Sequence, residues 1–207
     1  MSVIAYTLVQ PHRGKRSAVE IRAKTAAGIY ARHGATVKVT RVIAGEHSGC
    51  IGLIRAYADF QTAVKTLQSV GADPAYQDFD RERESNPVAD VLVSRNIARR
   101  VFGEGKWATH PVTLLRRYDL LKKNMEGALG MLSQVADLVG KSDVNVIGLT
   151  PVAADDMSTL TVSYQFTSME HMGESLDGVG TSDEMRALIA KASDLGTLRS
   201  ASMMVPI

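Results

Sequence analysis

Two stretches of this sequence match one another at a constant offset of 109 residues, and they decide the fold. Residues 68–79 read QSVGADPAYQDF, and residues 177–188 read DGVGTSDEMRAL. The pair Val70-Gly71 in the first stretch recurs as Val179-Gly180 in the second. In each stretch a glycine interrupts one helical pattern, and a capping residue shortly after it begins another. A repeated helix break of this kind indicates that the chain contains the same structural unit twice.

The same order of strands and helices surrounds each stretch. Runs rich in β-branched and apolar residues predict strands, and apolar stripes with capping residues predict helices. In the first half we expect strands at 3–9, 36–44, 51–58 and 88–97, with helices at 15–33, at 60–70 and from 74 onward. In the second half we expect strands at 111–118, 144–149, 159–167 and 198–205, with helices at 121–139, from 169 to the Gly180 break, and from about 182 to 192. Both halves follow the order β-α-β-β-α-β.

This order predicts an α+β protein built from two tandem ferredoxin-like repeats. Each repeat would form a four-stranded antiparallel sheet with its helices on one face. We place the first repeat at residues 1–101, a glycine-containing linker (FGEGKWAT) at 102–109 and the second repeat at 110–207. The strands carry apolar residues on the other face as well, so we expect the two repeats to pack sheet to sheet, as in a dimeric α/β-barrel-type fold.

Composition excludes several classes of protein. Hydrophobic residues make up 45% of the 207 residues, which predicts a sizeable core. The formal net charge is only +2, so we expect no nucleic-acid partner. Cys50 is the only cysteine, which excludes an intrachain disulfide. No apolar run approaches the roughly 20 residues that cross a bilayer, and the histidines lack ligand spacing. We expect a cytoplasmic protein with no membrane partner and no metal site.

The order of elements, together with the stretch DPAYQDF at 73–79, resembles the dimeric α/β-barrel superfamily. That group includes antibiotic-biosynthesis monooxygenase-like, EthD-like and NIPSNAP-like proteins. The resemblance covers nearly the whole chain, although the second copy of the stretch reads SDEMRAL and no catalytic signature is present. It implies a small-molecule pocket between sheet and helices or within the barrel. It does not choose among the oxygenases, haem-processing enzymes and proteins without known activity that share the fold.

Polar residues on the predicted strands of the first half are the candidates for chemistry. We expect Tyr6, Arg55 and Tyr57 to share the sheet face that points away from the helices, with Arg41 beside them. Arginine supplies paired donors and tyrosine a hydroxyl, which together suit an anionic or phenolic substrate. We assign Arg55 and Tyr57 to catalysis and Tyr6 and Arg41 to substrate binding. The alternative is a hydrogen-bonded patch between sheets or a set of exposed strand residues.

Five further candidates lie in a turn of the first half and at the start of the second half. His47 lies in a glycine-bracketed turn at the rim of the sheet, where it could contact a substrate. Arg116 and Tyr118 share one strand face and are further substrate-binding candidates. Trp107 could form a pocket wall, and His110 could act as a base near neutral pH. The alternative for Trp107 and His110 is a structural role at the junction between the repeats.

The two copies of the third strand present a question of register. At the offset of 109, Arg55 aligns with Tyr164 and Tyr57 with Phe166. In the second copy these positions belong to an apolar face, whereas in the first they alternate with Gly52 and the other small or apolar residues. Because a one-residue slip exchanges the two faces of a strand, either a bulge separates the copies or their sheets are lined differently.

We carry three functional hypotheses from the sequence. In the first, the protein is a cofactor-independent, monooxygenase-like oxidoreductase, or a related lyase or isomerase, that deprotonates a phenolic or enolic compound and lets its electron-rich carbon react. In the second, it binds a small molecule or self-associates as a homodimer without turnover. In the third, it binds or processes haem, with the methionine-rich second half as the place for the group, although no histidine is clearly placed as an axial ligand. The substrate cannot be read from these residues.

Overall fold

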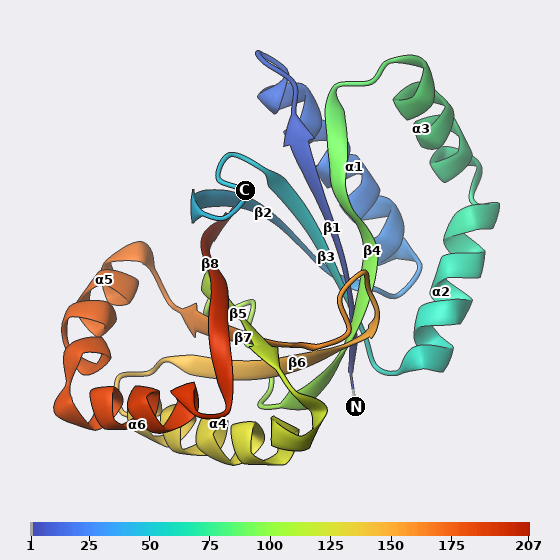
Figure 1. Ribbon diagram of the computed structural model, residues 1–207. Coiled ribbons are helices and arrows are strands. Elements are labelled where there is room, and N and C mark those ends of the chain that lie inside the picture. Colours follow the sequence, from blue (N-terminus) through green and yellow to red (C-terminus); the bar gives the residue numbers. More distant parts are fainter. Residues whose placement is uncertain (1) are drawn as a thin grey trace. The chain divides into compact units, whose positions relative to one another are not determined.

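The computed structural model describes residues 2–207, with the side chains of Val93, Ser94 and Arg95 left aside (Figure 1). Contacts divide the chain into two compact units. The first unit comprises the chain up to Arg99 together with the short segments 152–155 and 206–207. The second unit comprises residues 100–151 and 156–205. The segment 102–109, expected to be a linker, lies within the second unit.

The first unit is a four-stranded antiparallel sheet covered by helices. Its strands are β1 (Val3–Pro11), β2 (Thr36–Gly45), β3 (Ile51–Tyr57) and β4 (Ala89–Phe102, of which the last three residues belong to the second unit), and its helices are α1 (Arg16–Arg32), α2 (Phe60–Ala72) and α3 (Pro74–Ser85). The strands lie in the order β4-β1-β3-β2. Figure 1 shows the three helices on the same side of this sheet, which we call its helix-facing side.

The second unit repeats the arrangement. Its strands are β5 (Val112–Leu120), β6 (Asn145–Ala153), β7 (Thr159–Phe166) and β8 (Gly196–Pro206), and its helices are α4 (Met125–Gly140), α5 (Met169–Asp177) and α6 (Asp183–Ser193), with single 3-10 turns η1 (Lys122–Asn124) and η2 (Val179–Thr181). The strands lie in the order β8-β5-β7-β6. The predicted α+β class and order of elements are therefore confirmed, while a common origin of the two halves stays a prediction.

Strand pairing answers the question of register between the copies. In the first unit Ala5 of β1 lies opposite Arg55 of β3, and in the second unit Leu114 of β5 lies opposite Tyr164 of β7. Both pairings run without a register shift, so no bulge separates the copies. Tyr164 thus occupies the position of Arg55, on the helix-facing side. The two sheets are lined differently: the first unit places an arginine where a packed apolar or aromatic side chain is the rule.

The helix break in the stretch 68–79 is built by Asp73. Its Oδ1 atom accepts a hydrogen bond from the backbone N–H of Ala75 at 2.9 Å, which caps α3, and Pro74 occupies the first position of that helix. Oδ2 accepts hydrogen bonds from Arg32 and from Nε2 of His33, each at 2.8 Å, near the end of α1. A single carboxylate therefore starts one helix and ties it to another.

Replacing Asp73 by alanine is expected to destabilise the protein in a pH-dependent manner. Hydrogen bonds from His33, Arg32 and the Ala75 N–H hold the pKa of the Asp73 carboxyl well below its ordinary value of 3.8. Because the folded pKa is depressed, the stabilisation is complete above the unfolded pKa and is lost as the pH falls toward the folded one. The difference in urea midpoint between wild type and Asp73→Ala should therefore be large at neutral pH and shrink at about pH 3.

The matched control for this prediction is Asp59→Ala. Asp59 caps α2 by accepting from the Thr62 N–H at 2.7 Å, without the two cationic partners that Asp73 has. We expect a smaller loss of stability in this variant. An Asp73→Ala effect that stays constant from pH 7 to about pH 3 would contradict the linkage argument.

Candidate functional site

The first unit contains a cavity of about 320 Å³ between the helix-facing side of its sheet and helices α1 and α3. Most of its surface is apolar, and this part is formed by Val9, Val19, Ala26, Ile51, Leu53 and Val88. Both the strand residues and the helix residues come from the predicted alternation of strands and amphipathic helices. A volume of this size falls at the lower end of the range for small-molecule sites.

Arg55 supplies a cationic group to this apolar cavity. Its residue is 2% exposed, and one of its terminal nitrogens donates to the Thr7 hydroxyl at 2.6 Å. Its Nε atom is buried and has no hydrogen-bond partner. The other two arginines of the lining are paired with carboxylates: Arg22 with Glu82 at 2.8 Å, and Arg83 with Asp80. Within the described part of the chain, no carboxylate lies within ion-pair distance of Arg55.

Aromatic rings from two helices face the same cavity. The guanidinium carbon of Arg55 lies 4.8 Å from the ring centroid of Tyr30 on α1, a cation–π contact. The Tyr30 and Tyr76 rings meet edge to face with centroids 6.1 Å apart, and Phe79 follows 6.0 Å from Tyr76. All three rings line the cavity. The lining also includes one acidic residue, the exposed Glu84. The buried part of the cavity combines flat aromatic walls with the cationic Arg55, which suits a planar anion.

Tyr57 lies two residues beyond Arg55 on the same strand face. Its hydroxyl is buried and has no hydrogen-bond partner. Burial raises the pKa of Tyr57 to about 12, against the opposing effect of Arg55, with a further small increase from Tyr30. The hydroxyl is therefore protonated at neutral pH and can act as a hydrogen-bond donor but not as a base.

The expectation that Tyr6 shares a face with Arg55 and Tyr57 is wrong. Tyr6 lies opposite Ile54, one residue out of step with Arg55, so its ring lies on the other side of the sheet. There it covers Gly52, where an added Cβ atom would approach the ring to 3.0 Å. Arg55 and Tyr57 point toward the helices rather than away from them, and the candidate set divides between the two faces of the sheet.

Arg41 and His47 lie outside the cavity lining. Arg41 is part-exposed and forms an ion pair at 3.7 Å with Glu20 of α1. His47 occupies the turn between β2 and β3 with a positive φ of 63°, and its nearest charged partner is Glu46 at 3.6 Å. Of the candidates in the first half, only Arg55 lines the cavity; Tyr57, like Arg41 and His47, is not among its lining residues.

In the second unit, Arg116 and Tyr118 share one strand face, as predicted, but this face points toward the helices rather than away from them. The Arg116 guanidinium lies 5.4 Å from the ring centroid of Tyr164. Tyr164 forms side-chain hydrogen bonds with Tyr118 and Arg116, and burial raises the pKa of its hydroxyl above the ordinary range. These three residues form a second arginine–tyrosine group. Arg116 and Tyr164 line a cavity of about 230 Å³, and all three residues line another of about 80 Å³.

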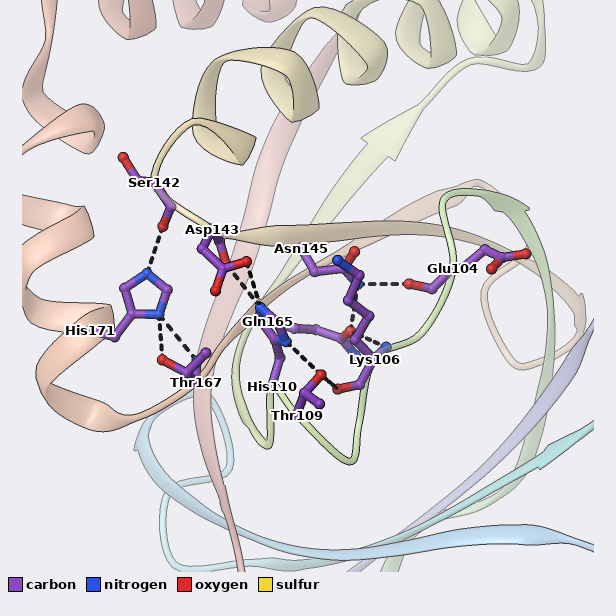
Figure 2. A network of polar contacts seen from close by, with 10 residues as sticks. All are labelled: Glu104, Lys106, Thr109, His110, Ser142, Asp143, Asn145, Gln165, Thr167 and His171. Carbon is purple, nitrogen blue, oxygen red and sulfur yellow. Dashed lines mark hydrogen bonds and ion pairs between the residues drawn. The ribbon is translucent and has the colours of Figure 1, made fainter.

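His110 belongs to a polar network at one end of the second unit (Figure 2). Its Nδ1 atom lies 2.9 Å from the Thr109 hydroxyl, and its Nε2 atom lies 2.9 Å from the backbone carbonyl of Asp143. His110 is 5% exposed and is not among the residues that line the three cavities. Trp107 is likewise outside them and packs over Gly105. Both ring nitrogens of His110 are thus engaged, Nδ1 with the Thr109 hydroxyl and Nε2 with a backbone carbonyl.

The centre of this network is Gln165 on β7 (Figure 2). Its Oε1 atom accepts hydrogen bonds from the backbone N–H of Lys106 at 2.9 Å and from the amide of Asn145 at 2.7 Å. Asn145 also donates to the carbonyl of Glu104 at 2.7 Å. Side chains of β6 and β7 therefore hold Glu104 and Lys106, within the segment 102–109 that the sequence suggested as a linker, in a defined conformation on the second unit.

Sequence reasoning missed the helix residues of the first cavity. Tyr30 lies on the buried face of α1, and Tyr76 and Phe79 lie in the DPAYQDF stretch, which served in the sequence only as a sign of the fold and of the duplication. The available signal was positional: a tyrosine on the buried face of a helix needs a partner for its hydroxyl or its ring. Thr7, whose hydroxyl accepts a hydrogen bond from Arg55, lies two residues from Ala5 on the same strand face.

No helix among the described residues is long and apolar enough to span a membrane. Within the same residues, no group of three or more histidine, cysteine, aspartate or glutamate side chains is arranged to hold a metal ion. Comparison of the sequence with protein-family models and with curated proteins gives no match.

Solved structures, in contrast, resemble the whole chain. A candidate monooxygenase from Fusobacterium nucleatum matches with a TM-score of 0.67 at 8% identity, over 99% of this chain and 92% of its own. A candidate monooxygenase from Lactobacillus acidophilus matches with a TM-score of 0.64 at 9% identity, over 99% and 93%. An anthrone oxidase-like protein matches with a TM-score of 0.61 at 9% identity, over 100% and 91%. At such low identity these matches establish the architecture, and the chain has the fold of the dimeric α/β-barrel superfamily.

Proposed function

We propose that the first unit binds a planar aromatic anion and promotes its oxidation by molecular oxygen without a bound cofactor. The observation that carries this proposal is Arg55. A guanidinium that is 2% exposed and has no carboxylate partner among the described residues is costly to bury. A ligand oxyanion would supply the missing charge and accept from the unpaired Nε–H. The rings of Tyr30, Tyr76 and Phe79 suit a flat aromatic body.

The proposed chemistry needs no protein base. A buried cation lowers the pKa of a bound phenol or enol, so the substrate binds as its anion and its proton passes to solvent. The electron-rich anion then transfers one electron to oxygen, which gives a substrate radical and superoxide. The two combine through a new carbon–oxygen bond to form a peroxide anion, which takes a proton back from solvent. The O–O bond of the resulting hydroperoxide then breaks as the carbon loses its remaining hydrogen, and water leaves a ketone. For an anthrone-type substrate the balance is one methylene plus one dioxygen, giving one carbonyl plus one water.

Two features of the protein support this assignment. Arg55 would hold the anionic oxygen through its unpaired Nε–H. The rings of Tyr30, Tyr76 and Phe79 would lie against the aromatic body of the ligand. Resemblance to two candidate monooxygenases and to an anthrone oxidase-like protein agrees with the proposal, although it extends only to the fold.

The alternative is that the first unit binds the anion without turnover. What favours it is that anion capture needs only the arginine and the rings. Haem, the third hypothesis, would need an axial donor. The residues that line these cavities include tyrosine and methionine, which can ligate haem iron, but no histidine and no cysteine.

The test combines calorimetry with an oxygen electrode. We expect naphthol and anthrone to bind more tightly as they deprotonate, methoxynaphthalene to bind at least about tenfold more weakly because it carries no charge, and anthrone to consume one oxygen per molecule. Binding without oxygen uptake above the uncatalysed rate would assign the alternative function. Equal binding of the charged and neutral compounds would overturn the role of Arg55.

A haemin titration completes the test. If the first cavity is built for aromatic anions alone, haemin should give no shifted Soret band at equimolar concentration. A shifted band that disappears in an Arg55 variant would instead support the haem hypothesis. Arg81→Met is the matched control, because Arg81 is an exposed arginine on α3 that pairs with Asp78 and lines no cavity described above.

A further inference from the structure

The second unit contains a cavity of its own, of about 230 Å³. It lies between the helix-facing side of the sheet and the segment from α5 to α6. Aliphatic side chains form most of the lining, namely Leu114, Val139, Val144, Leu176, Val179 and Ile189. Met185 and the ring of Phe166 complete its apolar surface. Nothing in the proposed oxidation uses this cavity.

Two polar groups point to a ligand there. Arg116 lines the cavity, and within the described residues no carboxylate lies within ion-pair distance of it; its neighbour is the Tyr164 ring. Ser175 is 6% exposed and also lines the cavity, and its hydroxyl is buried without a hydrogen-bond partner. A serine within a helix ordinarily bonds a preceding carbonyl or water. The Ser175 hydroxyl lacks a partner altogether, and Arg116, whose side chain is hydrogen-bonded to Tyr164, lacks an anionic one. An anionic oxygen would supply both.

The shape of the lining distinguishes this cavity from the first. At the offset of 109 residues, Tyr76 of the first unit corresponds to Met185 and Phe79 to Leu188. Of these two counterparts, Met185 lines the cavity and Leu188 does not. The helix side of the cavity therefore presents a methionine and aliphatic side chains in place of aromatic rings, and such side chains adapt to a flexible chain.

We propose that the second unit is a separate binding site for an aliphatic monocarboxylate of short to medium chain length. Arg116 would hold the carboxylate through paired N–H donors, Ser175 would donate its hydroxyl hydrogen to a ligand oxygen, and the chain would occupy the aliphatic part of the cavity. This inference concerns a different cavity from that of the proposed oxidation and stands independently of it. The two halves of one chain would then recognise two chemically different anions.

The experiment is a calorimetric titration of the full-length protein with octanoate. We expect one site for octanoate, at least about tenfold weaker binding of the neutral methyl octanoate, and weaker binding of naphthoate at this site. Arg116→Met should weaken octanoate at least about tenfold. Ser175→Leu should abolish it, because the added side chain fills the cavity. Arg186→Met is the control: this exposed arginine of α6 pairs with Asp183 and should leave the affinity unchanged.

Several results would overturn the proposal. These are the absence of octanoate binding, an affinity unchanged in both Arg116→Met and Ser175→Leu, and equal affinity for the methyl ester. Loss of octanoate binding in an Arg55 variant but not in Arg116→Met would place the ligand in the first cavity and would also refute it. Because the two substitutions act on different elements, β5 and α5, misfolding of one still leaves the other as a test, and far-UV circular dichroism identifies such a case.

Discussion

Replacing Arg55 by methionine is expected to weaken the binding of an aromatic anion about 100-fold and, at the same time, to raise the free energy of unfolding by about 1–2 kcal/mol. The two effects have one cause. In the free protein the guanidinium is buried with the Thr7 hydroxyl and the Tyr30 ring as its neighbours, and its Nε–H has no acceptor. The charge has therefore lost its hydration without gaining a counter-ion.

Methionine has a similar length and no charge, so it fills the same space without this cost. Removing a buried ionic group in favour of a well-packed apolar one is often stabilising by a few kcal/mol, and here no anionic partner is left behind. The ligand, in contrast, loses the cationic partner that Arg55 provides. The other two arginines of the cavity lining, Arg22 and Arg83, are already paired with carboxylates. A loss of about 2.7 kcal/mol in binding corresponds to the expected 100-fold change.

Urea denaturation and calorimetry measure the two quantities separately. Arg55→Lys is the informative companion, because it keeps the charge but loses the planar fork that binds an oxyanion through two parallel bonds. We expect it to bind weakly and to gain no stability. An Arg55→Met protein that is less stable than wild type would show that Arg55 is a structural residue held by Thr7 and Tyr30, and would remove the main support for the proposed site.

The order of strands and helices was predictable because it depends on local patterns. Alternating apolar residues, glycine breaks and the capping residues Asp59, Asp73, Ser168 and Ser182 act within a few positions, and the structure shows each of these side chains accepting a backbone N–H at a helix start. The duplicated helix break was informative for the same reason, since a cap and its helix lie next to one another in the sequence.

The composition of the site was less predictable because it depends on strand register. Whether Tyr6 lies beside Arg55 or on the opposite face is decided by a single residue of offset between β1 and β3, and alternation alone does not fix that offset. The assumption that polar strand residues point away from the helices failed at Arg55 and Tyr57. The sequence nevertheless contained information on this point. At an offset of 109 it aligns Arg55 with the apolar face of the second copy, and an arginine at a position expected to be apolar indicates a functional or strained site.

The residues on helices were hidden for another reason. Tyr30, Tyr76 and Phe79 satisfy a core pattern, and a ring that lines a cavity has the same helical spacing as a ring that packs in a core. Only the position of α3 relative to α1 and the sheet, a tertiary property, distinguishes the two. His110 shows the opposite case, in which a residue with suitable chemistry is fully used by the backbone around it.

Replacing Gln165 by leucine is expected to lower the free energy of unfolding by about 3 kcal/mol and to open the segment 104–110 to proteolysis. Gln165 is fully buried, and its Oε1 atom accepts from both the Lys106 N–H and the Asn145 amide. Leucine has a similar volume, so the core stays filled, but the two donors lose their acceptor. Each buried donor left unsatisfied costs about 1–3 kcal/mol.

The loss should appear first at Lys106, because its backbone N–H is one of the two orphaned donors. Trypsin cleaves after lysine, so limited proteolysis followed by mass spectrometry reports directly on this segment. A local opening that becomes easier by about 2.7 kcal/mol raises the cleavable fraction about 100-fold. Gln134→Leu, which changes an exposed glutamine of α4 in the same unit, should leave both the urea midpoint and the cleavage rate near the wild-type values.

The outcome decides what kind of connection joins the two halves of the chain. If Gln165→Leu exposes Lys106 while the rest of the second unit stays protected, the segment is a separately held element whose conformation depends on the side chains of β6 and β7. If cleavage at Lys106 is already rapid in the wild type, the hydrogen bonds to Gln165 and Asn145 contribute little, and the segment is a flexible linker as its glycines suggest. A large loss of stability without new cleavage at Lys106 would instead show that Gln165 acts through the core of the second sheet rather than through this segment.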